Sequence, residues 1–347
     1  MTTPAPCWVL PRHCWSTNQS PQLRHLEKDR IPVAYTNNPK YSGVIPPVIT
    51  PRTADGAIDA AGLDAVVEHL IDGGVAGLFV LGSSGEVPYL ANAERDAVLA
   101  RIVAANAGRV PVLVGASEQT TARVIDEGQR LIALGADALV VTTPFYAISN
   151  GPEIEAHFTA IHDALQVDIF AYDVPVRTHH KLPLDVAIRL AQSGAIVGVK
   201  DSSGDDVSFR QLLLATKDIE GFSVFTGHEV VVDGALLGGA HGVVPGLGNV
   251  DPAGYRRLFD LAVAGDWAGA AAEQDRLARV FDIVYTPDAS RVSPGAAGLG
   301  AFKTALVELG IIANNAMSAP MASLDASEAA AIRGILAETG LLPVAAK

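Results

Sequence analysis

Residues 196–204 read IVGVKDSSG. The first four are apolar or glycine, which is typical of a strand buried on both faces, as parallel strands are. Lys200 follows, where the apolar run ends and a polar turn begins. Burial lowers the pKa of an ammonium, and a lysine placed in this way becomes a nucleophile near neutral pH. The simpler interpretation is a lysine whose amine extends from the strand end into solvent.

The same unit, a short apolar run followed by a helical pattern, recurs on both sides of this stretch. The runs are Val44–Ile49, Ala76–Leu81, Val110–Val114, Ala138–Thr142, Asp168–Tyr172, Ile196–Val199, Ser223–Phe225 and Gly242–Val244. Eight such units over about 220 residues predict an α/β fold, a closed (β/α)8 TIM barrel at residues 43–266. An open doubly wound sheet is the alternative, but residues 246–251 lack the third glycine of a dinucleotide-binding fingerprint.

The pattern after Asp251 is purely helical, with candidate helices at residues 255–264, 267–283, 296–310 and 327–338. This alanine-rich part is too short for a second core. We therefore expect residues 267–347 to form a C-terminal helical appendage on the barrel. Within the barrel, helix N-caps are expected at Asp59, Asn92, Thr120 and Asp205.

Residues 1–42 differ from everything that follows, because they are rich in proline and show no sustained periodicity. They also lack the long apolar core of a secretory signal. We expect a flexible N-terminal arm, or upstream sequence from an over-long start assignment. The two cysteines of the chain, Cys7 and Cys14, both lie here, so no disulfide framework holds the body, which is consistent with a cytoplasmic location.

The charge and hydropathy of the sequence limit the kinds of molecule that the protein can be expected to bind. The 347 residues carry 25 Lys and Arg against 38 Asp and Glu, a formal charge of −13, and no basic stripe. This argues against binding to nucleic acid or to an anionic membrane surface. No apolar run approaches the roughly 18 residues of a membrane-spanning helix. Small molecules are the expected partners.

In a (β/α)8 barrel the active site lies at the C-terminal ends of the strands. The residues that follow the runs are Ser83, Ser84, Glu86, Ser117, Thr143, Phe145, Tyr146, Tyr172, Asp173, Arg177, Lys200, His228, Glu229 and Asn249. One lysine, two tyrosines, paired hydroxyls and an arginine on one face suit imine chemistry on a keto acid. Lys200 would attack the carbonyl, a tyrosine and a serine would carry protons, and backbone N–H groups of the 83–84 turn would hold a carboxylate.

Each candidate also has a purely structural interpretation. Tyr172 could fill the barrel rim, and Tyr146 could pack within its loop. The 83–84 turn, between two glycines, could be only a tight turn. Arg177 could pair with Asp173 as a loop brace.

Three other kinds of protein were compared with the imine interpretation. A metal site is disfavoured, because the adjacent His179 and His180 would point apart on a strand and no further ligand spacing accompanies them. A hydrolase nucleophile elbow would need glycine where Glu86 stands. A non-catalytic keto-acid-binding protein would need no lysine at the strand end.

Four motifs, in this order and spacing, resemble the dihydrodipicolinate synthase / N-acetylneuraminate lyase superfamily of Schiff-base lyases, with the synthase branch closest. Residues 82–86 (GSSGE) resemble the family's GTTGE turn, and residues 143–146 (TPFY) its TPYY. Residues 172–178 (YDVPVRT) resemble YNVPxRT, and residues 199–201 (VKD) resemble the Schiff-base lysine segment. The resemblance extends over about residues 43–310.

This resemblance implies roles for the catalytic residues. Lys200 would form an imine with pyruvate, and Tyr172 would be the central proton carrier. Ser84 would link Tyr172 by hydrogen bonds to Tyr146, which the family donates across a tight dimer interface. The family's usual assembly is a tetramer of two such dimers, so a homo-oligomer, a dimer of dimers, is expected.

The resemblance also implies substrate-binding residues. Ser83 and Ser84 would bind the pyruvate carboxylate, and Val244 would contribute to the same pocket. Arg177 matches the arginine that, in the synthases, holds the carboxylate of aspartate semialdehyde. No cofactor and no metal are expected.

The predicted function is that of a pyruvate-dependent Schiff-base lyase or aldolase similar to dihydrodipicolinate synthase. It would condense pyruvate with an aldehyde such as aspartate semialdehyde. The alternatives are a 2-keto-3-deoxy sugar-acid aldolase or dehydratase of the same superfamily, and a non-catalytic keto-acid-binding protein. Serines replace both threonines of the turn, Asp173 replaces asparagine, and the pattern of residues 201–205 (DSSGD) is also common in sugar-acid aldolases.

Overall fold

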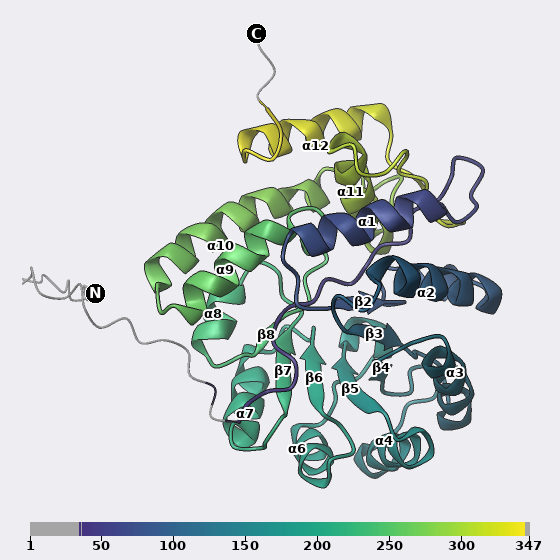
Figure 1. The fold of residues 1–347 in the computed structure, drawn as a ribbon, viewed down its shortest axis with the longest axis vertical. Helices are drawn as coiled ribbons and strands as arrows, with labels where there is room; N and C mark the ends of the chain where they lie inside the picture. Colours follow the sequence, from purple (N-terminus) through teal and green to yellow (C-terminus); the bar gives the residue numbers. More distant parts are fainter. Residues whose placement is uncertain (1–34, 36, 344–347) are drawn as a thin grey trace, which may run out of the picture. The chain divides into compact units, whose positions relative to one another are not determined.

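Eight parallel strands curl into a barrel in the computed structural model, which describes residue 35 and residues 37–343 (Figure 1). The strands are β1 (Gly43–Val44), β2 (Leu78–Val80), β3 (Val112–Gly115), β4 (Ala138–Thr142), β5 (Asp168–Asp173), β6 (Gly198–Asp201), β7 (Ser223–Thr226) and β8 (Gly242–Val243). Their hydrogen-bonded order is β1-β8-β7-β6-β5-β4-β3-β2. A parallel bridge between Pro47 and Phe79 brings the segment after β1 against β2 and closes the ring. The predicted α/β, TIM-barrel-like fold is confirmed.

Alternation along the strands separates two apolar layers. In β4, Ala138 and Val140 point into the barrel, where they pack with Phe170 and Phe225. Leu139 and Val141 belong instead to the larger cluster between the strands and the helices. This is the packing expected of a strand that is buried on both faces.

Two strands differ from their predicted bounds. The run Val44–Ile49 yields only β1, because Pro46 and Pro47 have no N–H to donate to a ladder. The run Ile196–Val199 begins pairing later and continues further, so that Lys200 lies inside β6. Tyr172 of β5 and Phe225 of β7 are its register partners.

Helices cover the outside of the strands (Figure 1). They are α1 (Ala60–Asp72), α2 (Asn92–Asn106), α3 (Thr121–Ala133), α4 (Gly151–Leu165), α5 (Pro175–Thr178), α6 (Leu184–Ser193), α7 (Asp206–Thr216), α8 (Val232–Leu237) and α9 (Pro252–Val263). Asp59, Thr120 and Asp205 cap α1, α3 and α7 as predicted. Asn92 does not cap α2, because it is the first helical residue and Glu94 instead reaches back to the Ala91 N–H.

Three further helices follow the barrel: α10 (Trp267–Phe281), α11 (Pro294–Glu308) and α12 (Ala326–Glu338). α10 packs on α9, and α11 packs on α12. Figure 1 shows α11 and α12 beyond α1, at the top of the view. Within residues 35 and 37–343, no helix is both long and apolar enough to span a bilayer.

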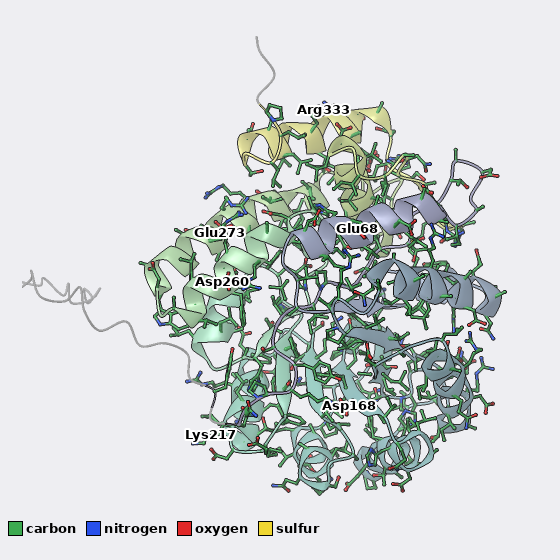
Figure 2. The ribbon with its side chains drawn as sticks, in the orientation of Figure 1. Glu68, Asp168, Lys217, Asp260, Glu273 and Arg333 are labelled. Atoms are coloured by element: carbon green, nitrogen blue, oxygen red, sulfur yellow. The ribbon has the colours of Figure 1, made fainter. Side chains whose placement is uncertain are left out.

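Most of the segment predicted as an arm, residues 1–34 and 36, lies outside the described residues. Residues 37–42 pack against the N-terminal end of the barrel. Asn37 donates to the Ile219 and Phe222 carbonyls at 3.1 and 2.8 Å. Tyr41 donates to Asp168 at 2.8 Å, at the start of β5 (Figure 2). These contacts position Tyr41 against Phe170 inside the barrel.

Candidate active site

Lys200 is held in an apolar cage near the C-terminal end of the barrel. Its side chain is 6% exposed. Its Nζ lies 4.0 Å from the ring centroid of Tyr172 and 4.5 Å from that of Phe79. Around the lysine stem, Ile45, Leu113, Val140, Phe170, Phe225 and Val244 line a void of only about 10 Å³. An amine in such a cage is poorly solvated and directly abuts a phenol.

Tyr172 has an environment that favours loss of its proton. Burial raises its pKa, but the charge of Lys200 and hydrogen bonds with Ser202, Lys200 and Ser83 outweigh burial and lower it. Thus the nearest phenol to the amine is also the one made more acidic. A proton carrier between amine and substrate needs this combination of contact and altered pKa.

Ser202 contacts Tyr172 because residue 227 is glycine. A Cβ on Gly227 would collide with the Ser202 hydroxyl. The sequence did not single out Ser202 as a site residue. Its contact follows from a side chain that is missing just after the next strand, β7, which no local pattern reveals.

The turn between Gly82 and Gly85 has the features of a carboxylate site. It is flanked by two non-glycine residues in the left-handed region, Leu81 (φ 56°) and Glu86 (φ 60°). Such strained conformations cluster at functional sites. Among the described residues, no hydrogen bond is donated by the N–H of Ser83 or Ser84. Two adjacent free N–H groups can bind an anion.

A buried ion pair supports this turn from α11. The Lys303 ammonium pairs with the Glu86 carboxylate, and Lys303 also donates to the Ala316 carbonyl at 2.9 Å. The second Glu86 oxygen accepts the Ser318 N–H at 2.9 Å. Thr50 donates to the Gly85 carbonyl at 2.7 Å. The backbone of the turn is therefore fixed from three sides.

A cleft of about 450 Å³ opens above Tyr172 and the serine turn. Its lining includes Ser83, Arg95, Ser117, Glu118, Arg123, Thr142, Phe145, Tyr172 and Arg177. Thr142, the register partner of Tyr172, presents a hydroxyl that has no hydrogen-bond partner among the described residues. The cleft thus carries several polar side chains on a largely apolar lining, and Tyr172 is part of that lining.

Comparison with known proteins decides the family. The model of the dihydrodipicolinate synthetase family matches residues 40–339. The chain is 33% identical over 302 residues to the 4-hydroxy-tetrahydrodipicolinate synthase of Ruegeria pomeroyi, covering 87% of this chain and 100% of that protein. The synthase of Phenylobacterium zucineum is 36% identical over 255 residues, 73% of this chain and 85% of that one. The chain belongs to the dihydrodipicolinate synthetase family.

Solved structures agree with the sequence comparison. The dihydrodipicolinate synthase of Bacteroides thetaiotaomicron matches with a TM-score of 0.81 and 31% identity, over 87% of this chain and 99% of that one. A prophage protein of E. coli K12 from the dihydrodipicolinic acid synthase family, solved in complex with pyruvate, matches with a TM-score of 0.80 and 29% identity, over 87% and 99%. Membership of the dihydrodipicolinate synthetase family confirms the predicted enzyme class, a lyase of the class I aldolase type.

Three of the four family motifs contribute residues to the cleft lining, whereas residues 199–201 contribute none. The hydroxyl that contacts Tyr172 is that of Ser83, whereas the resemblance predicted Ser84. Tyr146 is 84% exposed within a single chain. Val244 lies beside the lysine stem inside the barrel.

Arg177 lies on α5, a single turn of helix that the sequence pattern did not predict. It is exposed and lines the cleft. The Asp173 carboxylate, its suggested partner, binds the Lys181 ammonium at 2.5 Å and the Leu182 N–H at 3.0 Å instead. None of the ion pairs among the described residues involves Arg177. The guanidinium is therefore available to a ligand.

Two residues from the ends of β7 and β8 behave differently from each other. Asn249 is structural, because its amide donates to the Pro47 and Gly246 carbonyls at 2.9 Å and accepts the Ile49 N–H at 3.2 Å. The Glu229 carboxyl accepts the Leu247 N–H at 2.5 Å, and burial raises its pKa to about 7. Within the part of the chain that the structure describes, no three His, Cys, Asp or Glu side chains are grouped as a metal site requires.

Proposed function

We propose that the chain is a pyruvate-dependent Schiff-base lyase that acts like the dihydrodipicolinate synthases. One observation carries this proposal: a buried lysine amine that abuts a tyrosine whose pKa is lowered, at the closed end of an open cleft. A lysine in this position attacks a keto group, and the phenol beside it carries the protons that addition and dehydration require.

In this mechanism the carboxylate of the keto acid binds the free N–H groups of Ser83 and Ser84. That contact aims the keto carbon at Lys200. Loss of water from the carbinolamine gives the imine, and Tyr172 carries protons with the Ser83 hydroxyl as its partner. The relay therefore begins at Ser83, while Ser84 contributes its N–H.

The second substrate is proposed to carry a carboxylate. Arg177 is the free cation at the cleft, and a guanidinium makes a two-pronged pair that matches a carboxylate. The first carboxylate is already held by the serine turn. Condensation of pyruvate with an acidic aldehyde such as aspartate semialdehyde fits this arrangement.

The hydroxyl groups that line the cleft support the alternative, a 2-keto-3-deoxy sugar-acid aldolase or dehydratase. Ser117 and Thr142 line its wall, and Ser202 adds a hydroxyl at Tyr172. Hydroxyls would pair with the hydroxyl groups of a sugar acid. A panel of aldehydes and sugar acids with the purified chain distinguishes the two reactions.

A homo-oligomer, a dimer of dimers as the resemblance implies, is part of the proposal. Tyr146 and Ile148 are both exposed in the loop that follows Phe145 of the cleft lining, and a second copy would cover them. Tyr146 would then complete the partner's relay. Residues 267–347 would act as a helical extension that supports the serine turn through Lys303. The cytoplasmic location stays a prediction.

Trapping of the imine tests the proposed function. Pyruvate and sodium borohydride should add the mass of a reduced pyruvyl group to the peptide that contains Lys200. Lys200→Arg should abolish the adduct. Lys181→Arg makes the same change at a lysine outside the cage and should leave the adduct intact. Turnover that resists EDTA should accompany the adduct. No adduct, or turnover that a chelator stops, would refute imine chemistry.

A further inference from the structure

The first turns of α11 form part of the wall of the cleft. Gly295 and Leu299 of this helix line the same cleft as Arg177. They are four residues apart and therefore lie on one side of the helix. Lys303, whose ammonium pairs with the Glu86 carboxylate, follows after four more residues. One stripe of α11 thus extends from the cleft to the serine turn.

The second half of α11 fixes the position of this wall. Lys303 and Glu86 are both buried, so their ion pair is shielded from water. The ring of Phe302 lies against Gly246, where an added Cβ would come within 2.7 Å of it. A substrate in the cleft therefore meets a helix that is anchored in the core and cannot easily withdraw.

The cleft lining presents two kinds of surface. Its hydroxyl groups come from the ends of strands, because Ser117 follows β3, Thr142 ends β4 and Tyr172 lies in β5. The side chains that α11 adds to the lining have no hydrogen-bonding group. A substrate hydroxyl that faces Leu299 would lose its water without gaining a partner, and this weakens binding. A methylene group in the same place would gain an apolar contact.

Gly295 leaves space for the guanidinium of Arg177. A Cβ on Gly295 would lie 3.7 Å from both terminal nitrogens of Arg177. Among the described residues outside α11, no third atom lies within 4 Å of that point, so the terminal edge of the guanidinium, and not its face, is turned toward it. Alanine fits at this distance. The carbons of a longer side chain would compete with the guanidinium for the space.

We propose that Leu299 and Gly295 determine which second substrate the site accepts. Leu299 favours a short aldehyde with a sparsely substituted chain over one with hydroxyl groups on successive carbons. Gly295 is a positioning residue that places Arg177 for the carboxylate at the other end of that chain. The inference rests on the proposed function and narrows its substrate class to short, acidic aldehydes. Aspartate semialdehyde belongs to this class, since its single polar substituent can turn toward the hydroxyl groups.

Three aldehydes with the same number of chain carbons separate the two roles. 4-Oxobutanoate is acidic and has only methylene groups between its ends. 2,3-Dihydroxy-4-oxobutanoate is acidic and hydroxylated, and butanal carries no charge. Each is condensed with pyruvate, and kcat/KM for the aldehyde is measured from the consumption of pyruvate. Borohydride trapping of the pyruvate adduct at Lys200 is measured in parallel for every variant.

Leu299→Asn tests the apolar contact, because asparagine has nearly the shape of leucine and adds an amide. The wild-type chain should prefer 4-oxobutanoate to the dihydroxy acid by about 10-fold or more, since an apolar site discriminates against an added hydroxyl by up to about 10²-fold. Leu299→Asn should lower this preference about 10-fold. Leu299→Met keeps the surface apolar and should retain the preference. Trapping of pyruvate should be similar in both variants.

Gly295→Leu tests the placement of Arg177. It should lower kcat/KM for 4-oxobutanoate about 10-fold, the lower end of the range for a lost hydrogen bond to a charged group, and should leave that for butanal unchanged. Gly298→Leu is the matched control, because it makes the same change on the same helix where an added Cβ would meet nothing within 4 Å. It should keep the wild-type preference for the acid over butanal.

Contrary results distinguish this inference from the proposed function. If the chain traps pyruvate but prefers the dihydroxy acid or condenses neither acid, the inference is overturned while the imine chemistry stands. The same holds if Leu299→Asn, shown to be folded by circular dichroism, keeps the wild-type preference. If that variant does not fold, Leu299→Ser decides by the same criterion.

Equal effects of Gly295→Leu and Gly298→Leu would overturn the role of Gly295. A wild-type chain that never traps pyruvate would refute the proposed function, and this inference with it.

Discussion

The Lys303 ammonium and the Glu86 carboxylate form an ion pair that neither water nor ligand reaches, with side chains 1% and 0% exposed. The pair joins a helix that follows the barrel to the turn that carries Ser83 and Ser84. Burial lowers the pKa of Lys303, and the charge and hydrogen bond of Glu86 oppose that effect. The shape of the proposed carboxylate site thus depends on a residue more than 200 positions away in the chain.

Lys303→Met should lower the free energy of unfolding by about 3–5 kcal/mol, because it leaves the Glu86 carboxylate buried and unpaired. Urea unfolding followed by circular dichroism measures the change. The double variant with Glu86→Gln should recover part of the loss. Arg256→Met, at an exposed ion pair with Asp260, is the control and should cost less than about 1 kcal/mol (Figure 2). Equal losses from Lys303→Met and Arg256→Met would contradict the prediction.

Tyr172→Phe should keep the fold and lower kcat by about 10²-fold or more, because it removes the phenol proton beside Lys200. Steady-state kinetics with pyruvate and the active aldehyde measure this. Tyr285→Phe, at an exposed tyrosine, should leave kcat unchanged. A near-wild-type rate for Tyr172→Phe would show that Tyr172 only packs at the barrel rim and carries no proton.

The two serines of the turn should differ. Ser83→Ala removes the hydroxyl that contacts Tyr172 and should lower kcat by about 10²-fold, the lower end of the range for proton-transfer effects. Ser84→Ala keeps the backbone N–H and should have a smaller effect on kcat. Measurement of kcat for the two variants under the same conditions tests this difference. A larger loss in Ser84→Ala would return the relay to the residue that the family resemblance indicated.

Arg177→Ala should leave trapping of the pyruvate imine nearly intact and weaken use of an acidic aldehyde by roughly 1.5–3 kcal/mol, the range for a charged hydrogen bond. The comparison is between borohydride trapping and kcat/KM for the second substrate. Arg177→Lys should recover little, because an ammonium cannot make the two-pronged pair. Loss of trapping and of thermal stability together would show that Arg177 is structural.

Acid should destabilise the chain through His241. Its Nδ1 accepts the Val224 N–H at 2.9 Å and burial lowers its pKa to about 4, so it stays neutral in the folded chain where an unfolded histidine is already charged. Between pH 6.5 and 4 the unfolded chain therefore binds more protons, and stability falls as pH falls. This group alone accounts for about 3 kcal/mol at pH 4.

Urea midpoints at several pH values measure that dependence. His241→Gln should be less stable at pH 7 but should lose less of its remaining stability between pH 6.5 and 4. The same loss in both chains would show that other groups cause the acid sensitivity.

The barrel and its lysine were predictable from the sequence because both are local signals. Eight apolar runs at regular intervals indicate the number of strands. A lysine at the end of such a run can be recognised from the linear sequence alone. The length of β1 was overestimated because the apolar run contains Pro46 and Pro47, whose missing N–H groups end the ladder.

The partners of the lysine and tyrosine were not predictable in the same way. Ser202 reaches Tyr172 because Gly227, just after β7, has no side chain. Glu229 is held by the N–H of Leu247, and that contact depends on how the segments after β7 and β8 meet. Such relationships arise only when separate strands are brought side by side.

The ring-packed interior around Lys200 implies an order of binding for the proposed reaction. Tyr41, Phe170 and Phe225 fill the described barrel beneath the amine, so we expect molecules to approach Lys200 from the cleft that Tyr172 lines. In the proposed reaction the keto acid would arrive first and occupy the deepest place, and its partner would then cover it. An excess of the partner would bar the way to the empty lysine, so that the aldehyde would inhibit its own conversion and added pyruvate would relieve the inhibition.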